Sequence, residues 1–487
     1  MIRTGEQYKE GLRDGREIWL DGERVKDVTD HAAFRPIVDI RARMYDMAHE
    51  EKTHEDFTYV EDNQRNTIFY KLPHEQKDWH DKWKAVDLLL NDIGGVVTRV
   101  GDETVGEMWS LYDGRDVLAE INPDFAGNID RHIKNVLAND IFHVSANTDP
   151  KGDRSLPPQE KDPDMMVHVS RETDAGIIIR GAKYETAAAY ADQAFLKPTV
   201  GAWTNEALSD YAVGCIVKMG APGVKHICRA SFAERDRRDY PLASRFDEVD
   251  TLVVFDDVLI PWEDVFFYRH TKAAQYIRST LHRYSAFPYV LRILYVADMM
   301  IGAAMWNARQ TGLDKMQAVK EKLADLVCYR EGINAHLVAS IAMAQKSPGG
   351  LLMPHQSMLY AGRVHACANL PQMMHIAREL CGGQICVTPS AASFDGDAAG
   401  EGSASWMKKF YSLNKAWGSE DRRKLLAFAR DLLNSDYAGH RLTFVQFAQA
   451  PHFNHLAAVY NSFDFDGPLE FVRKSAELSE DVKGPLH

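Results

Sequence analysis

The 487-residue sequence contains none of the short motifs that would assign a nucleotide or hydrolase site directly. No P-loop is present, no GxGxxG follows a strand-like run, and neither HExxH nor GxSxG occurs. The one glycine-rich stretch, residues 396–403, follows no strand pattern and is interpreted as a loop. These absences argue against a Rossmann site for NAD(P)H, a zinc protease and an α/β-hydrolase.

Cysteine is scarce, and basic charge is outnumbered by acidic charge. The six cysteines form no CxxC pair, so we expect buried free thiols in a cytoplasmic protein rather than a disulfide framework. A formal net charge of -13 disfavours nucleic acid as a partner. The first residues contain no apolar segment, so no signal peptide is expected. The most apolar run, residues 290–306, contains Arg292 and Asp298 and predicts a buried helix, not a membrane span.

The spacing of apolar residues divides the chain into three predicted domains. Residues 1–150 show mainly helical spacing, and residues 151–270 contain short β-type runs separated by turns. Residues 271–487 are helical again, with long helices predicted at 313–344 and 353–380. We therefore predict an α+β fold, mostly α, with an N-terminal helical domain, a central β-barrel and a C-terminal helical bundle. The bundle has more apolar surface than one chain can cover, which predicts a homotetramer.

Three segments carry residues suited to chemistry. Arg99 and His143 can together hold an oxyanion or phenolate, although each residue taken alone is more often a surface or capping residue. Residues 147–154 form a polar, turn-rich loop or an interdomain linker. Residues 380–390 combine glycines with Thr388 and Ser390, which suits a pyrophosphate contact or a simple helix end.

Longer stretches resemble one known family. The sequence is similar to the 4-hydroxyphenylacetate 3-monooxygenase family in GREIW (15–19), GERVKDVT (22–29), HAAFR (31–35), ETDAGII (172–178), YPLASRFDE (240–248) and VVFDDVLIPWE (253–263). These matches are ordered along nearly the whole chain. The resemblance implies an acyl-CoA-dehydrogenase-like fold.

A second resemblance points to 4-hydroxybutyryl-CoA dehydratase, a flavin and iron–sulfur enzyme, in TDPKGDR (148–154) and HRYS (282–285). That branch ligates its cluster with three cysteines and a histidine. His282 matches the histidine, but the cysteine positions fall on Val96, Val100 and Tyr289. Because valine cannot ligate iron, no cluster and no metal are expected.

The first resemblance implies a two-component monooxygenase. A separate reductase supplies FADH2 by diffusion, molecular oxygen is the co-substrate, and a flavin hydroperoxide hydroxylates a small aromatic, phenolic or related substrate. The histidine either protects the peroxide or deprotonates the substrate. The implied FAD-binding residues are Asn147, Arg154, Lys183, Thr186, Gln384, Thr388 and Ser390.

In this family, Arg99 and His143 match an arginine and a histidine that grip a phenol oxygen. Glu103 stands where the family has a tyrosine, and helical spacing predicts that it lies one turn from Arg99. A carboxylate at this position would repel a phenolate and would suit an amine or a hydrogen-bond donor. The alternative is that Arg99 and Glu103 form a surface pair.

Two other functions remain open from the sequence. One is a redox-neutral flavoenzyme, such as a cluster-free dehydratase or isomerase of an acyl-CoA. The other is a flavin-binding scaffold subunit without catalysis. Oxygen uptake with reduced FAD distinguishes the oxygenase from both.

Overall fold

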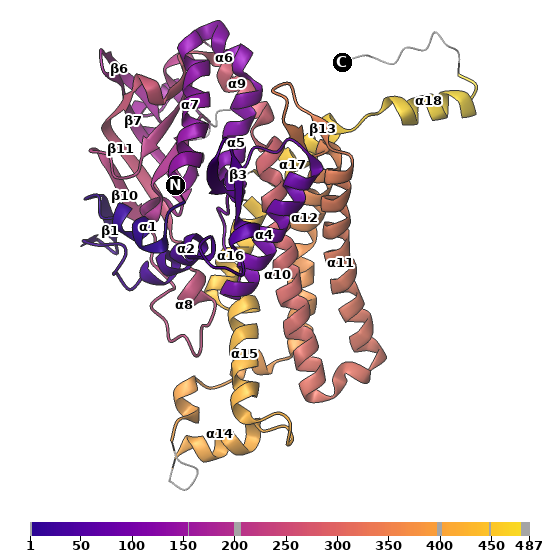
Figure 1. Ribbon diagram of the computed structural model, residues 1–487. Coiled ribbons are helices and arrows are strands. Elements are labelled where there is room, and N and C mark those ends of the chain that lie inside the picture. Colours follow the sequence, from indigo (N-terminus) through magenta and orange to yellow (C-terminus); the bar gives the residue numbers. More distant parts are fainter. Residues whose placement is uncertain (1, 154, 199–205, 397–401, 448–449, 479–487) are drawn as a thin grey trace.

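The computed structural model describes residues 2–153, 155–198, 206–396, 402–447 and 450–478. Two β-sheets and the N-terminal helices form one side of the molecule, and a bundle of long helices forms the other (Figure 1). The last helix, α18 (Asp466–Ser475), extends away from the body.

A six-stranded sheet has the strand order β2-β1-β10-β11-β7-β6. Its strands are β1 (Glu17–Leu20), β2 (Glu23–Val25), β6 (His168–Thr173), β7 (Gly176–Thr186), β10 (Val224–Cys228) and β11 (Asp250–Pro261). All neighbours are antiparallel except β1 and β10. The long strand β7, between β11 and the edge strand β6, is buried at almost every position, because both of its faces are covered.

A four-stranded sheet has the order β12-β9-β8-β5. Its strands are β5 (His143–Ala146), β8 (Gln193–Leu196), β9 (Val213–Lys218) and β12 (Val265–Tyr268). Thr148, just after β5, bridges to Tyr184 of β7 and so joins the two sheets. Two small hairpins are β3 (Thr58–Glu61) with β4 (Gln64–Thr67), and β13 (Gln345–Lys346) with β14 (Leu352–Met353).

The prediction of a central β-barrel is wrong, because the described strands form open sheets in which the first and last strands do not pair with each other. Alternation of apolar residues identifies strands but not whether a sheet closes. The edges come from distant sequence: β1 and β2 join one sheet and β5 joins the other, all from the zone predicted as mainly helical.

Helices of the N-terminal half pack around these sheets. They are α1 (Gly5–Gly11), α2 (Arg35–Met47), α3 (His54–Phe57), α4 (Gln76–Ile93), α5 (Asp102–Asp113), α6 (Arg115–Ile121), α7 (Pro123–Asn139), α8 (Ala243–Phe246) and α9 (Thr271–Thr280). Local signals fix their ends. Asn122 caps α7 with Pro123 at its first position, and Gly94 ends α4 in the left-handed conformation.

The bundle is built on α10 (His282–Thr311), α11 (Gln317–Ala342) and α12 (Gln356–Cys381), which confirms the two predicted long helices. The smaller helices are α13 (Gln384–Val387), α14 (Ser403–Tyr411), α15 (Ser419–Leu433), α16 (Asp436–Phe447) and α17 (His452–Ser462). The run Thr271–Thr311 is long and apolar enough to cross a membrane, but 67% of its apolar window is buried inside the protein. It is therefore interpreted as a core helix, as the sequence predicted.

All six cysteines are free. Cys215, Cys228, Cys367 and Cys381 are buried, as expected, whereas Cys328 and Cys386 are exposed. Burial of the thiols was therefore predicted correctly at four positions and wrongly at two.

Candidate active site

A cluster of charged side chains lies where α5 meets the sheets and α10. This ion-pair cluster consists of Arg99, Glu103, Glu107, Glu185, Lys197 and Arg292. The carboxylates come from α5 and β7, and the cations come from the residues flanking α5 and β8 and from α10. Charged groups are rarely buried unless paired, so six together at one junction mark a candidate functional site.

Arg99 precedes α5 rather than lying in it, with a left-handed φ of 59°. Its guanidinium pairs with Glu185 (Nη2 to Oε1, 2.7 Å), and its backbone N–H donates to Glu103 Oε2 at 3.0 Å. Arg41 Nη1 donates to the Arg99 carbonyl oxygen at 2.9 Å. A non-glycine residue in this conformation costs on the order of 1–3 kcal/mol, and these contacts hold it there.

Glu103 also differs from its prediction. The helical spacing from Arg99 is wrong because α5 begins only at Asp102. The alternative of a surface pair is wrong too, since Glu103 is 2% exposed and its Oε1 lies 3.1 Å from Arg292 Nη2. The Glu103 carboxylate is therefore paired with Arg292 and accepts a hydrogen bond from the backbone amide of Arg99.

Lys197 is fully buried and contacts the side chains of Glu107 and Ser145. Burial lowers the Lys197 pKa, although Glu107 opposes this. Burial raises the pKa of Glu185 to about 8, against the attraction of Arg99 and Lys197. Glu185 is therefore largely protonated at neutral pH.

The raised pKa of Glu185 predicts a specific pH dependence of stability. The folded protein keeps a proton that the unfolded chain loses above pH 4.5, so this contribution is full below pH 4.5 and is lost as pH rises to about 8. Replacing Glu185 with Gln removes the loss. We expect the free energy of unfolding of Glu185→Gln, relative to wild type, to rise by about 1 kcal/mol per pH unit between pH 5 and 8. Denaturant titrations across this range measure it, and a pH-independent difference would contradict it.

His143 lies on β5 and is completely buried. Its Nδ1 is 3.1 Å from Gln193 Nε2, and its Nε2 has no hydrogen-bond partner among the described residues. Burial, with smaller effects of His132 and Lys197, holds the His143 pKa well below its ordinary value. The ring is therefore neutral. Ser145, two residues along the strand and on the same face, bonds to Glu107 and places the ring beside the cluster.

Comparison with known proteins identifies the family. The family profile described as 4-hydroxyphenylacetate 3-hydroxylase N terminal matches residues 4–267, and the corresponding C-terminal profile matches residues 271–477. The chain belongs to the 4-hydroxyphenylacetate 3-hydroxylase family. The family resemblance inferred from the sequence is thereby confirmed.

Individual relatives cover the whole chain. The oxygenase component of 4-hydroxyphenylacetate 3-monooxygenase from Thermus thermophilus is 26% identical over 99% of this chain and 100% of its own. The FADH(2)-dependent monooxygenase TftD from Burkholderia cepacia is 27% identical over 98% of this chain and 92% of its own.

Solved structures of two other proteins superpose on nearly the whole of this chain. The oxygenase component of 4-hydroxyphenylacetate 3-monooxygenase, complexed with FAD and 4-hydroxyphenylacetate, superposes with a TM-score of 0.89 at 26% identity, covering 98% of each chain. An archaeal 4-hydroxybutyryl-CoA dehydratase from N. maritimus has a TM-score of 0.90 at 22% identity, covering 100% of this chain and 97% of its own. The second likeness shows a shared fold alone.

The residues predicted to bind FAD in this family member fall into two groups. Lys183 lies on β7, two residues before Glu185. Its Nζ pairs with Asp149 (2.5 Å) and donates to the carbonyl oxygen of Asn147 at 3.2 Å. Thr186 follows on β7 and donates to Asp250 at 2.5 Å. This first group adjoins the ion-pair cluster. Arg154 lies outside the described residues.

The second group, Gln384, Thr388 and Ser390, lies after α12 at the far end of the bundle. The Gln384 side chain accepts from Arg422, and the Thr388 carbonyl oxygen accepts from Arg430, both on α15. α15 leads down toward α14, away from β7 (Figure 1). Within the described chain, no hydrogen bond connects this group with the cluster or with Asn147 and Lys183.

Sequence reasoning missed Glu107, Glu185, Lys197, Arg292 and Gln193. A signal was present for two of them. Lys197 directly follows the apolar strand Gln193–Leu196, and Glu107 lies one helical turn after Glu103. Arg292 was considered only as a charge that interrupts an apolar run, and Glu185 was not singled out at all.

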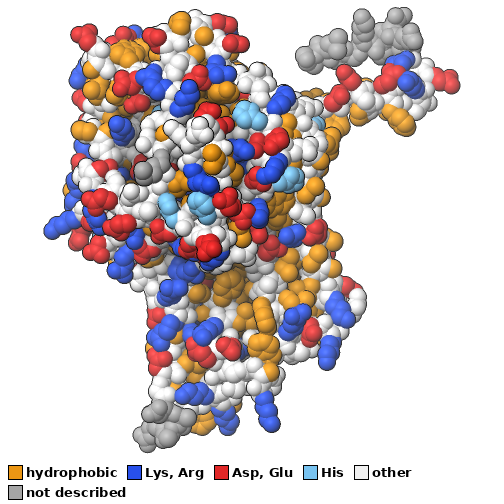
Figure 2. Space-filling model, in the orientation of Figure 1, with side chains coloured by type: hydrophobic (Ala, Val, Ile, Leu, Met, Phe, Trp, Pro, Cys, Tyr) orange, Lys and Arg blue, Asp and Glu red, His pale blue; other side chains and the backbone are white. Residues whose placement is uncertain are grey.

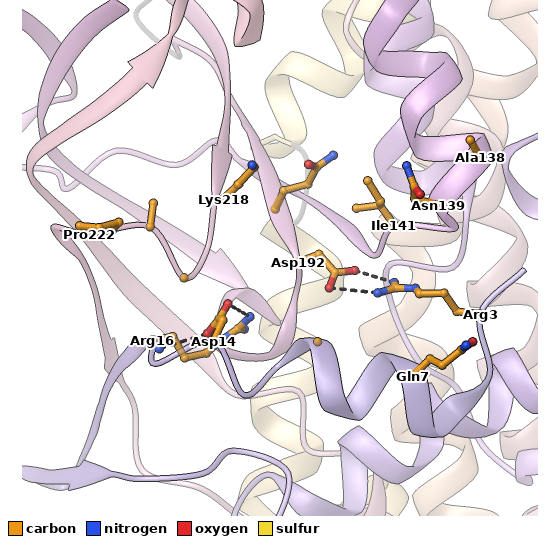
Figure 3. A pocket seen from close by; sticks show the side chains of 14 residues that line it. Arg3, Gln7, Asp14, Arg16, Ala138, Asn139, Ile141, Asp192, Lys218 and Pro222 are labelled. Atoms are coloured by element: carbon orange, nitrogen blue, oxygen red, sulfur yellow. Dashed lines mark hydrogen bonds and ion pairs between the residues drawn. The ribbon is translucent and has the colours of Figure 1, made fainter. Parts of the chain in front are cut away.

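An open cavity lies elsewhere in the described part of the chain. A cleft of about 800 Å³ runs between α1, the end of α7 and the turn after β9 (Figure 3). Its walls are stiffened by the pairs Arg3–Asp192 (2.6 Å) and Arg16–Asp14 (2.8 Å). Gln193 also lines it and is its link to His143. A smaller apolar cavity of about 60 Å³ adjoins Arg292.

Proposed function

We propose that this chain is the oxygenase component of a two-component monooxygenase that uses FADH2 and molecular oxygen to hydroxylate a small phenolic aromatic compound. Membership of the family supports the reaction class. The names of the relatives support the cofactor and the kind of substrate. The ion-pair cluster supports the phenolic group in particular.

The charge balance of the cluster carries this proposal. The cations Arg99, Lys197 and Arg292 are each paired with one carboxylate, of Glu185, Glu107 and Glu103 respectively. Burial raises the pKa of Glu185 to about 8, so this carboxyl is mostly neutral at pH 7. The permanent cation Arg99 then faces a neutral partner in a buried environment, which favours a substrate bearing an anionic oxygen.

Several buried polar atoms at this site have no hydrogen-bond partner among the described residues. Arg99 Nε and His143 Nε2 are two of them, and each such atom costs about 1–3 kcal/mol. A phenolic oxygen bound by both side chains would satisfy these two atoms. We therefore propose Arg99 and His143 as the residues that bind the substrate oxygen and orient the ring.

The role proposed for Glu103 changes with its contacts. Its carboxylate is bound to Arg292 and to the Arg99 amide, so it does not stand free to repel a phenolate. We propose that Glu103 positions Arg99, and that the family's phenolic substrate class applies to this chain as well. This chain has no tyrosine at position 103, and we propose that His143 and Arg99 bind the substrate oxygen without it.

We place the cofactor on the sheet side of the site. Lys183 donates to the Asn147 carbonyl oxygen, and Thr186 follows on the same strand, so the three residues lie together beside the cluster. FAD, when bound in reduced form, supplies the electrons with which molecular oxygen is activated. We propose that these residues hold it and that Arg154, by sequence, joins them. A separate reductase is proposed to supply FADH2 by diffusion, in the cytoplasm.

We further propose that Gln384, Thr388 and Ser390 reach an FAD only across an interface between copies of this chain, in a homotetramer. Figure 2 shows hydrophobic side chains gathered over the bundle, and α18 carries exposed apolar residues far from the body. Leu469 and Phe471 are 65% and 73% exposed. A second copy of the chain is the surface that α18 is proposed to cover.

This assembly gives a test by light scattering. Leu469→Glu with Phe471→Glu is expected to shift the mass from a tetramer to smaller species at micromolar concentration, because charge replaces the apolar contact. Glu470→Gln, on the same helix, is the control and should leave the mass unchanged. A wild-type monomer would contradict the tetramer, and an unaffected double variant would remove α18 from the interface.

The function itself is tested by oxygen uptake with chemically reduced FAD. We expect uptake coupled to product in the presence of a phenol, and hydrogen peroxide without product in its absence. A dehydratase or isomerase converts an acyl-CoA without consuming oxygen, and a scaffold subunit does neither. Either of those results would replace the proposed function.

A further inference from the structure

The strongest unassigned feature is a hydrogen-bonded bridge behind His143. Gln193 Nε2 lies 3.1 Å from His143 Nδ1 and 2.9 Å from His132 Nε2. The three side chains come from β5, β8 and α7, so the bridge joins the four-stranded sheet to a helix. All three are buried. Nothing in the proposed chemistry requires this bridge, yet Gln193 contacts the His143 ring, which we propose binds the substrate oxygen.

The bridge determines where the imidazole protons are. A glutamine amide nitrogen has two hydrogens and no acceptor capacity, so it donates one hydrogen bond to each ring. Burial lowers the pKa of His132 to about 3 and holds that of His143 well below its ordinary value, so both rings are neutral. A neutral imidazole that accepts at Nδ1 carries its proton on Nε2.

We propose that Gln193 is a positioning residue that fixes His143 as its Nε2–H tautomer, so that His143 donates a hydrogen bond to the substrate oxygen and does not act as a base. This rests on the proposed function, since it assigns the manner in which the same site selects its substrate. With Arg99, both groups at the substrate oxygen are then donors. The site therefore binds the phenolate form.

Other charged groups near His143 leave this assignment intact. Lys197 follows β8, Glu107 lies on α5, Glu185 lies on β7, and the first two are paired with each other. His132, from α7, packs against His143 with ring centroids 5.9 Å apart. Among the described residues, none of these groups forms a hydrogen bond with His143 Nε2. With its amide nitrogen toward the two rings, Gln193 has no buried side-chain atom that lacks a partner.

The tautomer is measured directly by NMR of the FADH2-loaded protein with ¹⁵N-labelled histidine, with His143→Gln used to assign the signal. A proton on Nε2 of a neutral His143 is the expected result. A proton on Nδ1 overturns the proposal, because the Gln193 amide would then be oriented with its oxygen toward the rings. This reading is independent of turnover, so it separates failure of the proposal from failure of the proposed function.

Substrate ionisation provides a second test. 4-Nitrophenol is coloured as the phenolate and colourless as the phenol, so its absorbance reports the bound form under anaerobic conditions with FADH2. Below the pKa of the free probe, wild type is expected to bind it as phenolate. Probe bound as neutral phenol, and hydroxylated when air is admitted, would overturn the proposal while leaving the function intact. Wild type that hydroxylates no phenol would overturn the function.

Variants separate positioning from plain stability. Gln193→Met removes both donors and is expected to weaken nitrophenolate binding by about tenfold or more, because His143 can then change tautomer. Gln310→Met removes another buried glutamine, 5% exposed against 4% for Gln193, and should leave binding unchanged. His143→Gln retains a donor but no base and should keep kcat within about tenfold of wild type. Equal loss in His143→Gln and His143→Leu would show that a base is needed and overturn the proposal.

Discussion

Arg99→Met is expected to lower kcat/KM for the phenolic substrate by about 10²–10³ while the protein stays folded. The guanidinium is the permanent cation proposed to contact the substrate oxygen, and its Nε has no other partner among the described residues. Folding survives because Glu185, with its pKa raised to about 8, is already largely protonated, so the loss of Arg99 leaves no buried anion without its cation. Steady-state kinetics with saturating FADH2 measure the change.

The matched control for this variant is Arg180→Met. Arg180 lies on β7, five residues before Glu185, and forms a solvent-exposed pair with Asp257 at 2.8 Å. Its removal should change kcat/KM by less than twofold, since such pairs contribute little. If Arg99→Met were as active as Arg180→Met, Arg99 would have no place at the substrate.

Lys197→Met is expected to have the largest effect on stability, lowering the free energy of unfolding by about 3–5 kcal/mol. The side chain is fully buried, and its loss leaves Glu107 as a buried carboxylate beside Ser145 without its cation. Denaturant titration at fixed protein concentration, followed by near-UV circular dichroism, measures the change.

The double variant Lys197→Met with Glu107→Gln should recover most of that loss, because no uncompensated charge remains. Lys84→Met is the control, since Lys84 pairs with Asp56 at 2.6 Å on the surface and contributes less than about 1 kcal/mol. A single Lys197 variant as stable as the Lys84 variant would mean that the Glu107 carboxyl is neutral in the folded protein.

The sequence predicted the helices better than the sheets, for a physical reason. The long helices α11 and α12 depend on contacts three and four residues apart, which the local sequence contains. The sheets depend on pairs such as β1 with β10, whose register joins Glu17 to Lys225. No local pattern encodes a pairing between residues so far apart in the chain. The sequence therefore could not show that the sheets stay open instead of closing into a barrel.

The candidate site divides in the same way. Arg99 and His143 were proposed as site residues from the family resemblance, by matching them residue by residue. Glu185 and Lys197 were missed because no local pattern marks them. Glu185 lies in a strand that also contains Arg180 and Lys183, and Lys197 follows β8. Only the fold brings Glu185 to Arg99 and Lys197 to Glu107. Glu103 was singled out from the sequence, but its partner Arg292 lies 189 residues further along the chain. The contact with Arg292 reversed the interpretation of Glu103 as a free carboxylate.

The most direct test of the central claim is turnover under ¹⁸O₂ with FADH2 and a panel of small phenols, followed by mass spectrometry. The proposed function predicts a product that contains one ¹⁸O atom per molecule and forms only when FADH2, oxygen and enzyme are all present. Product whose added oxygen comes from water, or conversion of an acyl-CoA without any oxygen uptake, would contradict it.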